Sequence, residues 1–415
     1  MVTAGLFLEA VYLLRFWTGS VKKTGERRFI PGNVLAILLT LAGTAWMVYS
    51  FRSGIDLSGG LIHQPMLRNL FLAIFAGGTL LSLPGTWNRT GEERSYRVWM
   101  IISGGALTLL PLAGNALTFF IFWEISAFAA VMAVSRGKDP IRGSFWYAVF
   151  ASASGFLLLA SIVISGEGFI AGPVPMALAA AAALIKMGQM GSHLWNVKAY
   201  PAAPATLPAY LSGTASKAAV LLLVLIAIHG GGGQLPWGRL LAWAGALTAL
   251  AMAAKAALSS DYKKVLAFAS VSQLGYILIG LGLASITGWT AAVYHTFHHF
   301  LFKTVLFLGA AGVIFRTGIS DYNRLGGLIR RMPITFMFTL ISVIAFAGVP
   351  PLAGFGGKWL LYNGLIETGW LPVALVAMFA SVIAFLYAFR LLYAVFLGQL
   401  APDHATIREA PVSYT

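Results

Sequence analysis

Long hydrophobic segments separated by short polar loops follow one another along the whole chain. Most contain at least about 18 residues, the length that a helix needs to cross a bilayer. The segments span residues 3–17, 31–51, 67–85, 97–112, 115–135, 143–165, 173–195, 205–229, 239–260, 263–285, 288–315, 331–363 and 371–397. The twelfth contains GVPPLAGFGG, whose prolines and glycines interrupt a helix. The pattern predicts an all-α, polytopic membrane protein with about 13 transmembrane helices.

The composition excludes a soluble enzyme. Only 10% of the 415 residues are charged and 59% are hydrophobic, whereas soluble domains have about 25% charged residues. The absence of cysteine excludes disulfides and cysteine-ligated clusters.

Gly280 and Gly282 lie inside a segment without the spacing of a dinucleotide site, so we expect close helix packing there. No cofactor is expected. The first segment contains Glu9 and lacks a basic n-region and a small-residue cleavage site, so we do not expect it to be a signal peptide.

Positive charge is distributed unevenly between the two sets of loops. The loops after odd-numbered segments, counted with the first two residues of the segment that follows, carry 17 lysines and arginines, and those after even-numbered segments, counted in the same way, carry 3. Basic loops remain in the cytoplasm, which predicts a prokaryotic-type inner membrane with the N-terminus outside and the C-terminus inside. The net charge of +15 then faces the anionic surface of the lipid bilayer, and no nucleic-acid partner is expected. We expect the polar tail, residues 401–415, to be frayed.

Ionisable residues inside the predicted spans are the main functional signal, because a charge at the membrane centre costs about 2.5–3.5 kcal/mol or more. Glu124 is flanked by bulky apolar residues, and Lys186 is the candidate counter-charge. Lys217 lies about a third of the way into its span, whereas Lys255 is close enough to a basic end to extend towards water. Lys358 directly follows GVPPLAGFGG, the interruption in the twelfth segment. A charged residue beside a broken helix is typical of ion sites in transporters.

The run YHTFHHFLFKTVLFL adds a titratable cluster. His295, His299 and Lys303 are spaced four residues apart and predict one polar helix face, and His298 is their neighbour. A metal is disfavoured because the segment holds no acid and Lys303 would repel a cation. Histidine exchanges protons near neutral pH, so these residues favour a proton relay. A Na⁺ or Ca²⁺ site would need oxygen ligands, whereas this interior offers mostly nitrogens.

Five stretches in the same order resemble the antiporter-like subunits of respiratory complex I, energy-converting membrane hydrogenases and Mrp-type cation/proton antiporters. They are FWEISAF, LIKMGQMGSHLWNVKAYPAAPATLPAYLSGTASKAAV, DYKKVLAFASVSQLGYI, HTFHHFLFKTVLFLGAAGVI and GVPPLAGFGGKW, between residues 117 and 361. Asn196, Val197 and Lys198 replace the family's usual Leu-Pro-Asp, and Pro208 replaces a serine. No long lateral helix follows the last segment, which favours a middle-type or reduced subunit.

The resemblance implies a proton-translocating, non-redox subunit without a catalytic cofactor or metal site. The implied relay comprises Glu124, Lys186, Lys217, Lys255, His295, His298, His299, Lys303 and Lys358. It also implies two inverted five-helix repeats with broken helices, at residues 97–230 and 231–400, after N-terminal helices in residues 1–96. The implied partners are other membrane subunits and, through the complex, a peripheral redox module.

Four alternatives remain at this stage. Two are transport functions, namely a module of a multisubunit Na⁺/proton antiporter and a proton channel coupled to another enzyme. The others are a membrane enzyme that uses the histidines with a metal, and a structural spacer that carries no protons.

Overall fold

The computed structural model describes residues 60–86, 91–166, 169–230, 237–400, 404 and 406–411. The first two predicted segments, together with Glu9, lie outside these residues. Within them every named element is a helix, and the only bridge of strand type joins Asp261 to Asp321. Eight of the described helices are long and apolar enough to cross a membrane. The prediction of an all-helical, polytopic membrane protein is confirmed.

The described helices have the following bounds. They are α3 (Pro65–Ser82), α4 (Gly91–Leu109), α5 (Ala116–Val134), α6 (Pro140–Ser165), α7 (Pro173–Met187), α8 (Leu194–Ala202), α9 (Leu207–Tyr210), α10 (Lys217–Gly230), α11 (Gly238–Leu258), α12 (Tyr262–Gly282), α13 (Ile286–Thr317), α14 (Pro333–Ala347), α15 (Ala353–Glu367) and α16 (Leu371–Leu392). Two π-helices, η3 (Leu211–Ala215) and η6 (Tyr393–Leu397), follow α9 and α16. Short 3₁₀ turns are η1 (Pro84–Thr86), η2 (Leu110–Leu112), η4 (Tyr322–Arg324) and η5 (Leu328–Arg330).

Local sequence signals set several helix starts. The Asn115 side chain accepts the amide of Thr118 at the start of α5, and Ser285 accepts the amide of Gly288 at the start of α13. Asp261 accepts the amide of Lys264 in the same way at α12. Such caps satisfy amides that the first turn leaves without a partner. Proline occupies the first helical position of α3, α6, α7 and α14, where its missing amide costs nothing.

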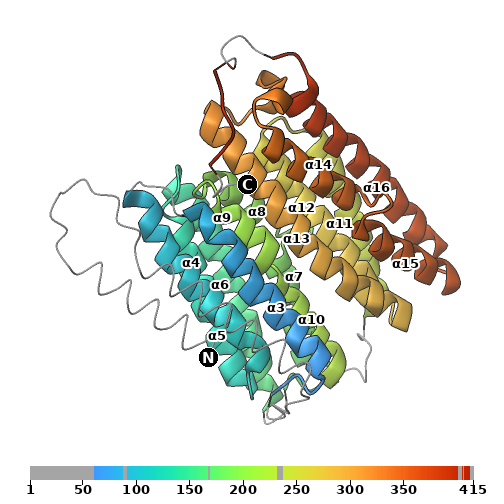
Figure 1. Cartoon of the computed structure of the whole chain (residues 1–415). Coiled ribbons are helices and arrows are strands. Elements are labelled where there is room, and N and C mark those ends of the chain that lie inside the picture. The colour runs from blue at the N-terminus through green and yellow to red at the C-terminus, as the bar shows by residue number, and fades with distance from the viewer. Residues whose placement is uncertain are drawn as a thin grey trace, which may run out of the picture.

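The helices form one bundle with two sides. Figure 1 shows α3 to α10, coloured blue to green, on one side and α11 to α16, coloured yellow to red, on the other. The 32-residue helix α13 joins them, because it packs against α3, α9 and η3 as well as α12, α14 and α15. The core is therefore shared between the two sides, and polar groups on α13 can meet residues from both.

Two helices are broken inside the bundle. The predicted interruption of the twelfth segment is confirmed, since α14 ends at Ala347 and α15 begins at Ala353. The seventh segment, 173–195, is also divided, which its hydrophobicity alone does not indicate. Here α7 ends at Met187 and Gly188 adopts a left-handed conformation with φ of 70°, which glycine accepts without strain. Gly348 ends α14 in the same way, with φ of 78°.

The break after α7 keeps its backbone groups bonded. Trp195 Nε1 on α8 donates to the carbonyl of Ile185 at 2.9 Å, and the Gln189 amide donates to Leu184 O at 3.1 Å. The Met190 amide donates to Thr248 Oγ1 on α11 at 3.1 Å. Irregular backbone is tolerated at membrane depth only when protein or water satisfies it.

Close glycine contacts lock α11 to α12. A side chain at Gly275 would collide with the carbonyl of Gly245, and one at Gly282 would collide with the carbonyl of Gly238. Gly280 makes a similar approach to Gly288 at the start of α13. The predicted packing role of Gly280 and Gly282 is therefore confirmed, as in other membrane bundles whose interfaces use small residues.

The tail corrects one expectation. Residues near Glu409 are ordered against α14 rather than frayed, because the Glu409 carboxylate accepts the Ile334 amide at 2.7 Å and the Thr335 hydroxyl at 2.6 Å. Arg316 also donates to the Glu409 carbonyl. A carboxylate at a helix N-terminus is favourable because it meets the positive end of the helix dipole. Polar composition alone did not indicate this contact.

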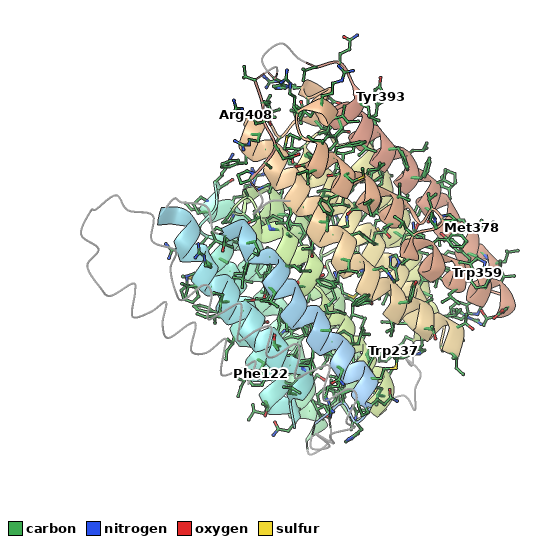
Figure 2. The ribbon with its side chains drawn as sticks, viewed as in Figure 1. Phe122, Trp237, Trp359, Met378, Tyr393 and Arg408 are labelled. Atoms are coloured by element: carbon green, nitrogen blue, oxygen red, sulfur yellow. The ribbon has the colours of Figure 1, made fainter. Side chains whose placement is uncertain are left out.

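Large apolar side chains cover the outer surface. Figure 2 shows Trp359 and Met378 at the outer edge of α15 and α16, and they are 52% and 46% exposed. Many other exposed leucine, isoleucine and phenylalanine side chains accompany them. Such a surface suits lipid or another membrane protein.

Replacing Gly275 with alanine is expected to lower the free energy of unfolding by about 1–3 kcal/mol, because the methyl group would separate α11 from α12. Thermal unfolding in detergent would measure the change. Gly77→Ala is the control, since the nearest atom to its added methyl is 4.0 Å away. Equal stability of the two variants would contradict the packing argument.

Candidate functional site

The side chain of Lys217 joins the two sides of the bundle. It begins α10, is fully buried, and its Nζ lies 2.5 Å from His299 Nδ1 on α13. Nζ also donates to Ser212 O at 2.6 Å and contacts Ser216 Oγ at 3.3 Å. Two titratable nitrogens from different sides of the bundle therefore share one hydrogen bond between fully buried side chains.

A π-helix places Lys217 at this point. In η3 the Ser216 amide reaches back five residues to Leu211 O instead of four. The wider turn precedes Lys217 directly, and the Ser212 carbonyl accepts both Lys217 Nζ and Ser216 Oγ, the latter at 2.8 Å. Gly213 lets this turn approach α13, because a side chain there would collide with Thr304 Oγ1. Single π-turns of this kind occur frequently at functional sites.

The histidines on α13 point in two directions. His295 and His299 are buried, as the predicted polar face requires, and the His295 Nε2 lies 3.1 Å from Gln273 Oε1 on α12. His299 Nε2 and His295 Nδ1 have no hydrogen-bond partner among the described residues. His298 lies on another face, half-buried beside Tyr294, with its Nδ1 2.8 Å from the Tyr294 carbonyl.

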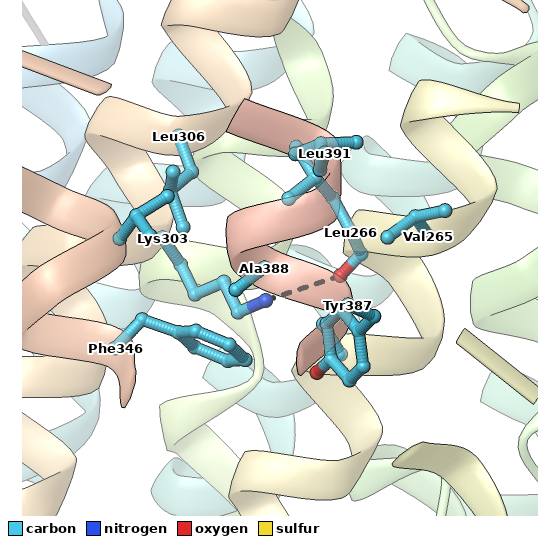
Figure 3. Close-up of a pocket in the computed structure, with 10 residues that line it drawn as sticks. Val265, Leu266, Lys303, Leu306, Phe346, Tyr387, Ala388 and Leu391 are labelled. Atoms are coloured by element: carbon cyan, nitrogen blue, oxygen red, sulfur yellow. Dashed lines mark hydrogen bonds between the residues drawn. The ribbon is translucent and has the colours of Figure 1, made fainter. Parts of the chain in front are cut away.

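Lys303 continues the buried face of α13. Its Nζ donates to Leu266 O at 3.2 Å and lies 5.0 Å from the centre of the Phe346 ring. Figure 3 shows it pointing into a small cavity between α12, α13, α14 and α16, where Tyr387 faces it. The Tyr387 hydroxyl is buried and has no partner in the described part of the chain. The Lys303 ammonium thus has one carbonyl acceptor and an aromatic face, which is a weak set of partners for a full charge.

Two serines connect the surroundings of Lys217 and Lys303. Ser212 Oγ and Ser270 Oγ are 2.7 Å apart, and Ser270 Oγ donates to Leu266 O, the carbonyl that also accepts Lys303 Nζ. The charges of Lys217 and Lys303 are close enough to act on each other. Because like charges repel strongly in a low-dielectric interior, protonating one of these lysines disfavours protonating the other.

Lys358 closes the second helix break. Its Nζ donates to Phe346 O at 3.2 Å and to Ala347 O at 3.1 Å, the last carbonyls of α14. Gly348 provides the space, because a side chain there would collide with the Lys358 stem. A cation at a helix C-terminus is favourable, and here it also satisfies carbonyls that the break exposes.

Glu124 and Lys186 are neighbours without direct contact. Their charges interact, yet no ion pair within 4.0 Å joins these two described residues. Lys186 Nζ instead lies 4.1 Å from the centre of the Trp123 ring, and Glu124 Oε1 is buried with no hydrogen-bond partner among the described residues. Gly155 on α6 makes room for the Glu124 carboxylate, which a side chain at that position would displace.

Lys255 belongs to a different environment. It is exposed, and its Nζ lies 3.1 Å from Nε2 of His193, in the break between α7 and α8. This placement agrees with the expected extension of Lys255 towards water. His193 was not among the predicted residues, because one histidine in a polar turn carries no distinguishing spacing.

The structure thus brings together Lys217, His299 and Lys303, with His295 and Lys358 close enough for their charges to interact. Within the described ranges no hydrogen bond joins Lys186 to Lys217, so the first pair stands apart. Sequence reasoning missed Ser212, Ser270 and Gln273, since buried serines and glutamines are too common in membrane helices to be informative. Among the described residues, no group of three or more histidine, aspartate or glutamate side chains is arranged to hold a metal ion.

Comparison with known proteins supports one family. The family model described as "NADH:quinone oxidoreductase/Mrp antiporter, TM" matches residues 174–384, just over half of the chain. An Na(+)/H(+) antiporter subunit of Alkalihalophilus pseudofirmus is 29% identical over 83% of this chain and 49% of its own length. "NADH-quinone oxidoreductase subunit N" of Desulforudis audaxviator is 27% identical, covering 86% of this chain and 74% of its own.

A solved structure agrees over the full chain. A chain of the membrane-bound sulfane sulfur reductase, described as an archaeal respiratory membrane complex, superposes with a TM-score of 0.86 and 27% identity, covering 100% of this chain and 72% of that one. The chain spans about half the length of several curated relatives that it matches. The resemblance found in the sequence is confirmed, and the chain belongs to the family of transmembrane subunits shared by NADH:quinone oxidoreductases and Mrp antiporters.

Proposed function

We propose that this chain is a proton-translocating, antiporter-like subunit of a membrane-bound, redox-driven complex of the complex I or hydrogenase type. The observation that carries the proposal is the buried Lys217–His299 contact, which links the two sides of the bundle at 2.5 Å. The relay comprises Glu124, Lys186, Lys217, His295, His299, Lys303 and Lys358. We assign Lys255 and His298, the other two predicted relay residues, to its periphery, because the first is exposed and the second faces another side of α13.

The physical basis is that one proton can be held at several places of similar energy. Lys217 and Lys303 bond mainly to carbonyl oxygens and not to a carboxylate, so neither charge is fixed by a permanent ion pair. Histidine can accept a proton on one nitrogen while releasing one from the other. His299 has this arrangement, with Nδ1 on Lys217 and Nε2 free of hydrogen bonds to the described residues.

The Glu124–Lys186 pair is proposed as the control point. Moving the carboxylate towards Lys186 stabilises the charged ammonium, and moving it away favours release of the proton to Lys217. Carrying one charge against 100 mV costs about 2.3 kcal/mol. A changed interaction between two partly buried charges is of this size when the effective dielectric constant is about 20. No hydrogen bond among the described residues joins Lys186 to Lys217, so the proposed path passes between them through water.

We infer about 13 transmembrane helices and two inverted five-helix repeats, residues 97–230 and 231–400, after helices in 1–96 and before the tail 401–415. The two 15-residue half-helices α7 and α14 support this division, since each ends at a left-handed glycine and is followed by a second half-helix. Because the first repeat contains an odd number of helices, the second repeat begins on the opposite side of the membrane and is inverted relative to the first.

We further propose the inner membrane of a prokaryotic-type cell, with the N-terminus outside and the C-terminus in the cytoplasm. Contacts at one end of the bundle support this orientation. Lys138 N donates to Ala202 O, Lys263 Nζ donates to Ala203 O, and Tyr262 N donates to Ser320 O. These bonds gather the basic segments at one end, as the distribution of positive charge requires.

The proposed partners are further membrane subunits and a peripheral redox module, because the described residues hold no group that could drive pumping. The similar archaeal chain belongs to a respiratory membrane complex, which favours the same kind of assembly here. An antiporter module that exchanges Na⁺ is the second candidate, because the similar protein from A. pseudofirmus belongs to a Na⁺/H⁺ antiporter. The nitrogen-rich relay favours protons alone.

Lys186→Ala is expected to reduce proton translocation by the parent complex in sealed liposomes at least about tenfold, since it removes a proton-carrying group. Translocation by the wild type should persist when K⁺ replaces Na⁺. Lys264→Ala is the matched control, because it removes the same charge from an exposed position. Sodium-dependent flux would favour the antiporter, and an unchanged rate in Lys186→Ala would mean that the chain carries no protons.

Gly155→Ala tests the control point without removing a charge. The added methyl would displace the Glu124 carboxylate, so we expect about a tenfold loss of translocation, comparable with loss of a positioned acid–base group. The measurement is proton uptake per turnover in assembled complexes. Gly77→Ala, which meets no atom nearer than 4.0 Å, should pump normally. Normal pumping by Gly155→Ala would show that the carboxylate position is unimportant.

A further inference from the structure

Three hydroxyl groups from three helices form a hydrogen-bonded chain beside Lys358. Tyr276 on α12 and Ser381 on α16 have their hydroxyl oxygens 2.9 Å apart. Ser381 and Tyr362, on α15, are 2.7 Å apart. The three residues come from elements that pack together only in the folded bundle, and nothing in their sequence spacing predicts the contact.

The backbone carbonyl of Ala377 can accept a hydrogen bond from the tyrosine hydroxyl at either end of this chain. The Tyr276 hydroxyl can donate to Ala377 O at 2.9 Å, and the Tyr362 hydroxyl can donate to the same oxygen at 3.4 Å. If Tyr276 donates to Ala377 O, Ser381 donates to Tyr276 and Tyr362 donates to Ser381. If all three hydroxyls turn round, Tyr362 donates to Ala377 O instead. Every hydroxyl keeps an acceptor in either direction, so the chain can reverse without exposing an unpaired donor.

Burial is greatest at Tyr276, the member of the chain beside Lys358, and is less complete at Ser381 and Tyr362. The Lys358 Nζ lies 5.2 Å from the centre of the Tyr276 ring, and Tyr362 follows Lys358 by one turn on the same helix. Tyr276 is 1% exposed, whereas Ser381 and Tyr362 are partly buried. The loop between α15 and α16 lies beside the start of α11, because Arg239 is 5.4 Å from the centre of the Trp370 ring, and α11 runs from there towards the basic segments around Lys263.

We propose that Tyr276, Ser381 and Tyr362 form the proton-conducting segment between Lys358 and the outer side of the membrane. This proposal rests on the proposed function, because it gives the relay an exit. Lys358 reaches the chain when its flexible stem releases the Phe346 and Ala347 carbonyls. Hydrogen-bonded hydroxyls polarise one another, which favours transfer along the whole chain over transfer to one isolated group.

The transfer conserves protons at each step. The transfer starts from the direction in which Tyr362 donates to Ala377 O. The Lys358 ammonium gives one proton to the Tyr276 oxygen while Tyr276 gives its hydroxyl proton to Ser381. Ser381 passes its proton to Tyr362, while the Tyr362 O–H turns away from the Ala377 carbonyl and gives its proton to water on the outer side. Lys358 becomes a neutral amine, outer water gains one proton, and each hydroxyl again holds one proton. The chain then points towards Lys358 and returns to its first direction by rotation of its three O–H bonds.

The test compares hydroxyl deletions that preserve shape. Tyr276→Phe, Tyr362→Phe and Ser381→Ala each break the chain, and we expect each to lower proton translocation by the assembled complex at least about tenfold. Ser381→Thr keeps a hydroxyl and should restore most of the rate. Tyr322→Phe is the matched control. It also removes a bonded hydroxyl from a buried tyrosine, which donates to Ser259 O at 2.7 Å, but away from Lys358.

Three outcomes separate the possibilities. Loss of pumping in the three deletions, with rescue by Ser381→Thr and normal pumping by Tyr322→Phe, supports the exit segment. Full pumping by the deletions, while Lys186→Ala is inactive, overturns the exit segment and leaves the proposed function intact. If the three deletions lose activity in proportion to a lowered melting temperature, the hydroxyls only hold α12, α15 and α16 together and the proposal is wrong.

Discussion

Burial of several lysines in one membrane bundle is the constraint to which the rest of this structure responds. Each lysine loses its hydration, so each must find acceptors that do not hold it permanently. Lys217, Lys303 and Lys358 all do so by donating to backbone carbonyls, which bind an ammonium more weakly than a carboxylate does. The carbonyls that accept Lys217 and Lys358 are available because the helices are irregular there, at a π-turn and at a break, whereas Lys303 donates to Leu266 O within the regular helix α12. The π-turn and the helix break therefore supply hydrogen-bond acceptors to buried ammonium groups.

The same constraint explains why α13 occupies the centre. A helix of 32 residues that contacts both sides of the bundle can present His295, His299 and Lys303 to neighbours from either side. The close approach of Gly280 on α12 to Gly288 on α13 keeps these two helices together, and Gln273 and Leu266 on α12 reach His295 and Lys303. Packing and chemistry are thus coupled, because the small residues that bring helices together also set the distances between titratable groups.

Much of the arrangement could be predicted from the sequence, and the reasons are physical. Long apolar runs predict helices because no other open structure satisfies its backbone in lipid, and a lysine within such a run is too costly to be accidental. Spacing of four residues correctly predicted the shared face of His295, His299 and Lys303. The break after Met187 was missed in the hydrophobic pattern, because one glycine in the left-handed region does not change hydrophobicity. Contacts such as Ser212 with Ser270, or Glu409 with the start of α14, depend on tertiary packing and leave no local pattern.

The central claim is that a proton crosses between the two sides of the bundle through Lys217 and His299. A double-mutant cycle tests it most directly, with proton translocation per turnover measured for Lys217→Ala, His299→Ala and the double variant in the same liposomes. If the two residues form one series path, each single variant should lose nearly all translocation and the double variant little more, so that the effects are strongly non-additive. Independent, additive losses, or normal pumping by either single variant, would contradict the account.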